Sequence, residues 1–131
     1  MNDGRHPLVV VGYDGSPTGR AAVDWAARRA GATGHVVVVH VLEGSPTGGE
    51  AVLDALVMTD DPLLGTSFET ELLDGRPADV LRTTATERGA DEIVVGARGH
   101  GMVHRALLGS VAHDLVQRSP LPVVVIPAAQ G

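Results

Sequence analysis

Two short glycine-rich stretches carry the residue types best suited to hold an anion. Gly96-Ala97-Arg98-Gly99 follows an apolar run, and a Gly109-Ser110 pair comes after nine more residues. Glycines let backbone N–H groups approach a bound group closely. A helix that begins at Ser110 would add the partial positive charge of its N-terminus. This spacing predicts a phosphate-binding loop.

A carboxylate follows the first apolar run of the chain, at Asp14 in the turn formed by residues 12–17. At such a place a carboxylate can hydrogen-bond a ribose hydroxyl or a base amine. The simpler alternative is that Asp14 only shapes the turn beside Gly15, as Asp often does. In the same way, Gly96, Gly99 and Gly101 could be ordinary loop glycines.

Composition limits the classes of function. The chain has 131 residues, is 44% hydrophobic and carries a net charge of −6, with ten arginines and no lysine. The missing basic cluster argues against nucleic acid and anionic membrane partners. The missing lysine excludes a Walker A loop, and the missing cysteine excludes disulfides and thiolate metal sites. Without a signal-peptide core or a transmembrane run, we expect one cytoplasmic domain over residues 1–131.

The elements that position these stretches follow from hydrophobic patterning. Continuous apolar runs predict buried strands, and one alternating run predicts an edge strand. The expected strands are 8–11, 35–42, 67–74 (the edge strand), 91–95 and 122–126. Helices are expected over 17–31 and 50–58, from Arg76-Pro77 to Gly89, and from Ser110, with Ser16 and Ser110 as N-caps.

Helical periodicity assigns a buried stripe to the first and the last helix. In the first helix the stripe has Trp25 as its bulky core contact and comprises Ala22, Trp25, Ala26 and Arg29. In the last helix it comprises Val111, Ala112, Leu115 and Val116.

Alternation of buried strands and helices predicts an α/β fold, an open parallel five-stranded sheet with helices on both faces, Rossmann-like in type. Right-handed crossovers then favour the strand order 3-2-1-4-5. The loops at residues 12–16 and 96–101 meet at the switch point between the first and fourth strands, where ligands bind in such sheets. The two stretches together predict a nucleotide site.

The motif Gly96-x2-Gly99-x9-Gly109-Ser110 is the most specific feature of the chain. Together with Val-Gly-Tyr-Asp-Gly-Ser at 11–16 and Pro-Val-Val-Val-Ile-Pro at 122–127, it resembles the adenine-nucleotide-binding branch of the universal stress protein family. The resemblance covers residues 7–43 and 67–127.

The resemblance implies ATP or AMP as ligand, sometimes with Mg or Mn at the phosphates. It implies that Asp14 and its turn hold the adenosine, that Val41 touches the adenine and that Gly96 lies near the ribose. The phosphates would lie on Gly99, Gly109, Ser110 and Val111. The full set assigned to the nucleotide is Gly12, Tyr13, Asp14, Val41, Gly96, Ala97, Arg98, Gly99, His100, Gly101, Gly109, Ser110 and Val111.

The segment 43–66 departs from the family pattern, because it has room only for a short helix where members usually carry a longer one. We expect it to be a shortened, partly flexible connection. His40 and His113 are expected to be partly buried structural residues. His100 and His104 are four residues apart but have no third ligand nearby in sequence, so no metal site is assigned.

The leading functional prediction is a stress-response or signalling module that binds an adenine nucleotide with little or no catalysis. A slow ATP hydrolase or phosphotransferase and a non-nucleotide interaction protein remain as alternatives. The apolar terminal strand within 122–127 predicts an edge-to-edge homodimer, which the resemblance also implies.

Overall fold

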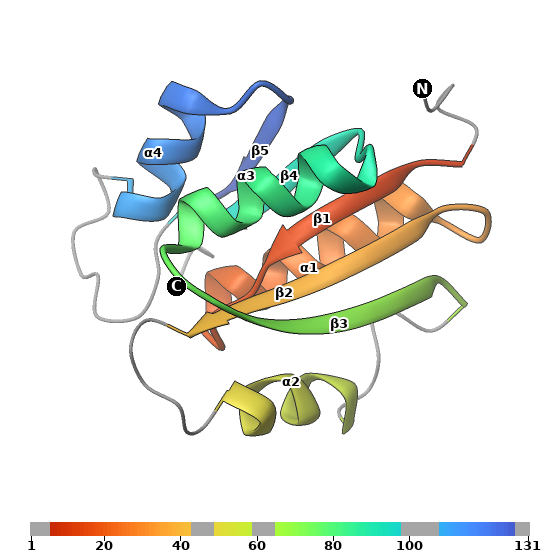
Figure 1. Ribbon diagram of the computed structural model, residues 1–131. Helices are drawn as coiled ribbons and strands as arrows, with labels where there is room; N and C mark the ends of the chain where they lie inside the picture. The colour runs from red at the N-terminus through yellow and green to blue at the C-terminus, as the bar shows by residue number, and fades with distance from the viewer. Residues whose placement is uncertain (1–5, 43–48, 59–64, 98–107, 128–131) are drawn as a thin grey trace.

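The computed structural model describes residues 6–42, 49–58, 65–97 and 108–127. Strands and helices alternate along the chain (Figure 1). In order they are β1 (Leu8–Gly12), α1 (Pro17–Ala30), β2 (His35–Leu42), α2 (Gly49–Met58), β3 (Ser67–Asp74), α3 (Pro77–Arg88), β4 (Glu92–Gly96), α4 (Ser110–Arg118) and β5 (Val123–Ile126).

The five strands form one parallel sheet in the order β3-β2-β1-β4-β5. This confirms the predicted fold class and strand order. The bounds of β2 and β3 are those predicted, whereas β1, β4 and β5 differ from the expected ranges by one residue at one or both ends. β1 lies at the centre and pairs with β2 on one side and β4 on the other, which creates the switch point.

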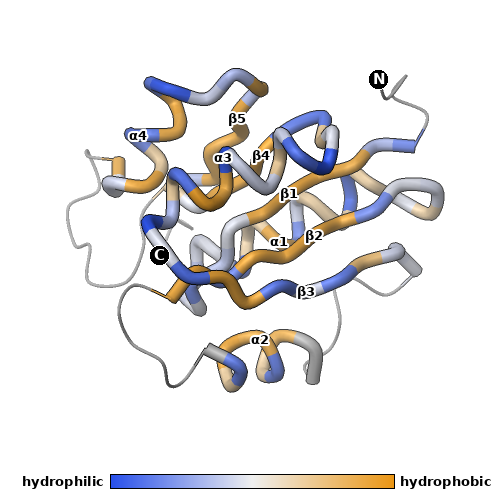
Figure 2. The backbone as a smooth tube through the Cα atoms, in the orientation of Figure 1, coloured by the Kyte–Doolittle hydropathy of each residue, from blue (hydrophilic) through white to orange (hydrophobic). Residues whose placement is uncertain are grey.

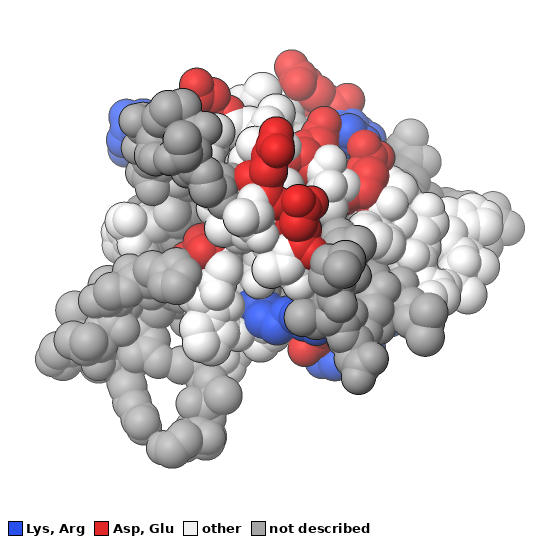
Figure 3. Space-filling view, turned by 90° about the horizontal axis from the view of Figure 1, so that it is seen from below, with Lys and Arg blue, Asp and Glu red and all other residues white. Residues whose placement is uncertain are grey.

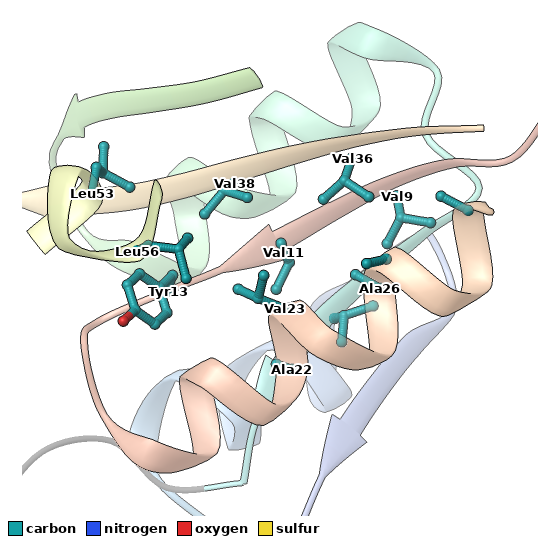
Figure 4. Packing of buried hydrophobic residues seen from close by; sticks show 13 residues of the cluster. Val9, Val11, Tyr13, Ala22, Val23, Ala26, Val36, Val38, Leu53 and Leu56 are labelled. Carbon is teal, nitrogen blue, oxygen red and sulfur yellow. The ribbon is translucent and has the colours of Figure 1, made fainter. Parts of the chain in front are cut away.

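Two hydrophobic clusters fill the space between the sheet and its helices. One lies between the sheet and α1 and α2 (Figure 4), and the other lies under α3 and α4. Valines from β1 and β2 point alternately into the two clusters, and most of them have no exposed surface. Figure 2 shows the result as hydrophobic stretches along β1 and along much of β2, as expected for strands covered on both faces.

Helix α1 has the predicted ends but a different buried stripe. Ser16 is the N-cap, its side chain accepting a hydrogen bond from the Gly19 amide, and Gly31 follows the helix with a φ of 63°. The core contacts are Ala22, Val23, Ala26, Ala27 and Ala30. Ala22 and Ala26 are buried as predicted, Trp25 packs against the same cluster, and only the prediction for Arg29 was wrong. Trp25 is only partly buried, and the exposed Arg29 reaches across to Glu92 of β4.

Helix α4 differs from the prediction at its start and on one face. Its N-cap is Gly109, not Ser110, which is the first helical residue. Ala112 and Leu115 are buried as predicted, but Val116 is 54% exposed. His113 is exposed as well, which corrects its assignment as a partly buried residue.

The segment between β2 and β3 contains the short helix that was expected. Leu53 and Leu56 of α2 pack onto the cluster shared with α1, while Glu50 and Asp54 are exposed. Seen from the side of α2 and β3, the surface is rich in acidic side chains (Figure 3). The predicted flexibility of 43–66 stays a prediction, because residues 43–48 and 59–64 lie outside the described part of the chain.

Candidate functional site

A pocket of about 430 Å³ lies at the carboxyl ends of β1, β2 and β4, at the switch point of the sheet. One wall comes from the β1–α1 turn and the end of β2, and includes the predicted residues Gly12, Tyr13, Asp14 and Val41. The facing wall comes from the end of β4 and the start of α4, and includes Gly96, Gly109, Ser110 and Val111. Residues far apart in sequence therefore converge on one cavity.

The remaining predicted site residues do not line the pocket within the described part of the chain. Ala97 is described, and its amide donates a hydrogen bond to the carbonyl of Ile126 in β5. Arg98, Gly99, His100 and Gly101 lie outside the described residues, as does His104.

The turn between β1 and α1 is closed by its own side chains. Asp14 Oδ1 accepts a hydrogen bond from the Ser16 amide at 2.9 Å, and Ser16 Oγ accepts from the Gly19 amide at 3.1 Å. The turn-forming alternative for Asp14 is thus realised at one of its oxygens. This role is compatible with ligand binding, because a carboxylate has two oxygens and about four acceptor positions.

Tyr13 contributes to the pocket from the side of α2. Its ring belongs to the hydrophobic cluster beneath α1 and α2, where Figure 4 shows it beside Leu56 with its hydroxyl directed away from the cluster. Burial raises the pKa of the Tyr13 hydroxyl, and Asp14 adds to the rise while Arg20 opposes it. The phenol is therefore neutral at physiological pH and can act as a hydrogen-bond donor.

Gly96 is required by packing. A Cβ built at this position would lie 2.6 Å from Thr18 Oγ1 and 2.8 Å from the Thr18 carbonyl carbon, so only glycine lets the first turn of α1 approach the end of β4 this closely. This close approach brings the two walls of the pocket together. Gly12 is less restricted, because its Cβ would first meet the flexible end of Leu81 at 2.8 Å.

The starts of α1 and α4 differ in how their backbone amides are used. In α1 the Ser16 hydroxyl caps the helix, whereas α4 has no side-chain cap. The amide of Gly109 itself donates to the Ala97 carbonyl at 2.7 Å. The next three amides belong to Ser110, Val111 and Ala112, in the first turn, where an α-helix offers no carbonyl partner. All three residues line the pocket, so the start of α4 can hold an anion there.

Several lining residues were missed by the sequence analysis. They are Ser16, Gly19, Val39, His40, Pro77, Leu81, Val95 and Ala112. His40 was interpreted only as a structural residue, although its place near the carboxyl end of a strand beside the switch point could have indicated a role at the site. Pro77 and Leu81 come from α3, and the position of that helix over the sheet is set by tertiary packing.

The described residues that line the pocket include few ionisable side chains. They contain one carboxylate, Asp14, and one imidazole, His40, and no arginine. Among the residues the structure describes, no group of three or more His, Asp or Glu side chains is placed to hold a metal ion. No helix within these residues is long and apolar enough to cross a membrane.

Comparison with known proteins agrees with this architecture. The family model of the universal stress proteins matches residues 8–127. The chain belongs to the universal stress protein family. A universal stress protein of Thermus aquaticus is 33% identical over 136 residues, covering 90% of this chain and 96% of that protein.

Solved structures of universal stress proteins share the fold. One, in complex with cAMP, superimposes with a TM-score of 0.76 at 30% identity, over 95% of this chain and 98% of its own. Another, from Archaeoglobus fulgidus in complex with dAMP, gives a TM-score of 0.68 at 29% identity over 94% and 98% of the two chains. Members similar to this chain thus bind adenine mononucleotides.

Proposed function

We propose that this universal stress protein binds an adenine nucleotide, ATP or AMP, in the pocket between the β1–α1 turn and the start of α4. In this proposal the protein acts in the cytoplasm as a stress-response or signalling module, and the bound nucleotide changes its state or its partners with little or no turnover. The nucleoside would lie against Asp14 and Val41, and the phosphates against Gly109, Ser110 and Val111.

The observation that carries the proposal is that two walls with different chemistry face each other across one cavity. Asp14 offers a hydrogen-bond acceptor for sugar or base, and the uncapped first turn of α4 offers amides for an anion. A nucleotide has both chemistries at its two ends. The complexes of similar universal stress proteins with cAMP and dAMP support the same class of ligand.

Efficient catalysis is not part of the proposal. Phosphoryl transfer needs a positioned acceptor and charge stabilisation around the transferred group. The described lining offers only Asp14 and His40 as ionisable groups apart from the neutral Tyr13. A resident metal ion finds no ligand cluster within the described residues. An Mg or Mn ion in this proposal would be held by the phosphates and water, as Mg²⁺ often is.

Isothermal titration with ATP, AMP and cAMP tests the proposal. The wild-type protein should bind at least one of them with a dissociation constant below about 1 mM, an interaction of about 4 kcal/mol or more. Asp14→Asn should weaken binding about tenfold, the loss expected for a hydrogen bond to a charged acceptor. The matched control is Asp54→Asn on the exposed face of α2, which should leave affinity unchanged.

A second variant tests phosphate binding at the start of α4. Asp is a strong N-cap residue, so Gly109→Asp should place a carboxylate on the first-turn amides of α4 and exclude phosphate. We expect binding to be lost while the far-UV spectrum is kept. The proposal would be overturned if the wild-type protein bound no adenine nucleotide at millimolar concentration. Turnover of ATP near one per second would favour the hydrolase alternative.

We also propose that β5 joins two copies of the chain edge to edge. Its four residues are apolar and only partly buried, and Val116 of the neighbouring α4 is exposed. The carbonyls of Pro122 and Ile126 bind the amides of Ile93 and Ala97. Alternation along the strand then directs the polar backbone groups of Val123 and Val125 to the open edge. An unpaired apolar edge favours association.

The backbone geometry gives a selective test of this dimer. Val125→Pro removes an outward N–H without removing a hydrogen bond to β4, a position where proline is tolerated in an edge strand. Analytical ultracentrifugation should show a dimer for the wild type and for the control Val125→Thr, and a monomer for Val125→Pro. A monomeric wild type at concentrations of about 100 μM would exclude the dimer.

A further inference from the structure

The side chain of His40 holds the turn that carries Asp14. His40 is partly buried near the carboxyl end of β2, and its Nδ1 lies 2.8 Å from the carbonyl oxygen of Tyr13. A carbonyl oxygen only accepts hydrogen bonds, so Nδ1 carries the proton and donates it. The contact links β2 to the residue immediately before Asp14.

Both polar backbone groups of Tyr13 are bound to neighbouring residues of β2. Its amide donates to the Val39 carbonyl at 2.9 Å, and its carbonyl accepts from the His40 ring. The first contact continues the hydrogen bonding of the sheet beyond Gly12. The second depends on a side chain. Without it, the peptide group between Tyr13 and Asp14 would lose the hydrogen bond from its carbonyl to β2, while the Tyr13 amide would stay bound to Val39.

The position of Asp14 follows from this peptide. Asp14 Oδ1 accepts a hydrogen bond from the Ser16 amide, so the position of the carboxylate is tied to the conformation of the turn. The turn in turn caps α1 through Ser16 Oγ and the Gly19 amide. His40 therefore connects the end of the sheet to the β1–α1 turn, which forms one wall of the pocket.

We propose that His40 is a positioning residue for nucleotide binding, which places the Asp14 carboxylate by holding the Tyr13 carbonyl. This rests on the proposed nucleotide function of the pocket. His40 acts through Asp14, so its contribution should disappear when the Asp14 carboxylate is absent.

Two substitutions separate the hydrogen bond from the shape of the side chain. The amide of asparagine can place an N–H near the position of Nδ1, so His40→Asn keeps the donor. Leucine fills similar space without a donor, so His40→Leu removes it. Measured by titration with AMP, His40→Leu should weaken binding about 5- to 10-fold, the range for one lost hydrogen bond, and His40→Asn by less than about twofold.

A double-mutant cycle distinguishes positioning from direct contact with the ligand. In the Asp14→Ala background, His40→Leu should weaken AMP binding by less than about twofold. A full 5- to 10-fold loss in that background would show that His40 contributes independently of Asp14, and would overturn the proposal.

A measurement without ligand keeps this inference separate from the nucleotide function. Amide hydrogen exchange of residues 14–16 should be faster by about 5-fold or more in His40→Leu than in the wild type, and close to wild type in His40→Asn. Equal exchange in all three proteins would overturn the positioning role. Failure of the wild type to bind any nucleotide would refute the proposed function but leave the exchange result to decide how the turn is held.

Discussion

The two ends of the parallel sheet are built in different ways. At the amino end the loops are closed by short contacts. Asp91 Oδ2 accepts the Leu8 amide at 2.8 Å, and Arg29 binds the buried Glu92 at 3.2 Å. At the carboxyl end the strands stop at a pocket of about 430 Å³ whose lining has few charges. At the amino end, polar side chains form contacts that stabilise the fold. At the carboxyl end, backbone amides and Asp14 face a cavity.

Gly34 and Gly12 show the same difference, although Gly96 at the carboxyl end is restricted by packing as Gly34 is. A Cβ at Gly34, at the amino end, would lie 2.5 Å from the carbonyl oxygens of both Ala30 and Pro7. These are backbone atoms that cannot move aside. A Cβ at Gly12, at the carboxyl end, would meet the movable end of Leu81. Substitutions at Gly34 and Gly12 should therefore affect different properties of the protein.

The largest expected effect is on stability, from Gly34→Ala. Forcing a methyl group between two carbonyls should lower the free energy of unfolding by about 3 kcal/mol, measured by urea denaturation. AMP affinity of the folded fraction should stay at the wild-type value. Gly12→Ala should do the reverse, with less than about 1.5 kcal/mol of destabilisation and a clear loss of affinity. Similar stability losses at both positions would contradict the contrast between the two ends.

A smaller loss is expected from Arg29→Ala. Glu92 is 8% exposed, and its Oε2 has no hydrogen-bond partner within the described structure, so Arg29 provides the contact to Oε1. Removing that partner from a buried carboxylate should lower the free energy of unfolding by about 2 kcal/mol, less than for a fully buried pair because Arg29 is partly exposed.

The control for Arg29 is a double-mutant cycle with Glu92→Gln. A neutral amide needs its partner less than a carboxylate, so Arg29→Ala should cost less than about 1 kcal/mol in that background. An equal loss in both backgrounds would mean that Arg29 stabilises the protein through packing of its aliphatic stem.

The smallest expected effect comes from Arg88→Ala, also at the amino end. Arg88 donates to both oxygens of Glu69, and His35 donates to Oε1 of the same carboxylate. The Arg88 hydrogen bonds, followed by that of His35, lower the pKa of Glu69. The folded pKa is thus below the unfolded value of about 4.3, so this stabilisation is present above that pH and is lost as the pH falls through the folded pKa.

The side chains of Arg88 and Glu69 are both partly exposed, so the change should be at most about 0.5 kcal/mol at pH 7. Urea midpoints of the wild type and Arg88→Ala should differ at pH 7 and converge near pH 2. The control variant is Arg76→Ala, at an exposed arginine whose ion pair with Asp79 is 3.9 Å long. Its urea midpoint should equal that of the wild type. A difference that persists at low pH would rule out the carboxylate as its source.

Much of the fold could be predicted from local patterns. The four valines of β2 and the alternation in β3 were sufficient to assign these strands and to place one inside the sheet and the other at its edge. Gly31 and Gly89 marked helix ends correctly because a positive φ is a local requirement. The strand order then followed from handedness.

The errors arose where tertiary contacts decide. Periodicity allowed Trp25 and Arg29 to share a stripe, but Arg29 is drawn to Glu92, which lies 63 positions away in the sequence. Val116 has the spacing of a core residue, yet it is exposed. The binding role of Asp14 and of the glycine motif stays a prediction. The sequence placed Asp14, Gly96 and Gly109 at the pocket. It missed His40, whose contact with Tyr13 exists only once β1 and β2 are paired.

Hydrogen exchange with and without AMP compares the two ends of the sheet most directly. The central claim is that the carboxyl end binds a nucleotide and the amino end only stabilises the fold. AMP at saturating concentration should slow exchange of the amides of residues 13–16 and 110–112, and leave those of residues 34–35 and 91–92 unchanged. Protection confined to the amino end, or no protection at any of these amides, would contradict the account.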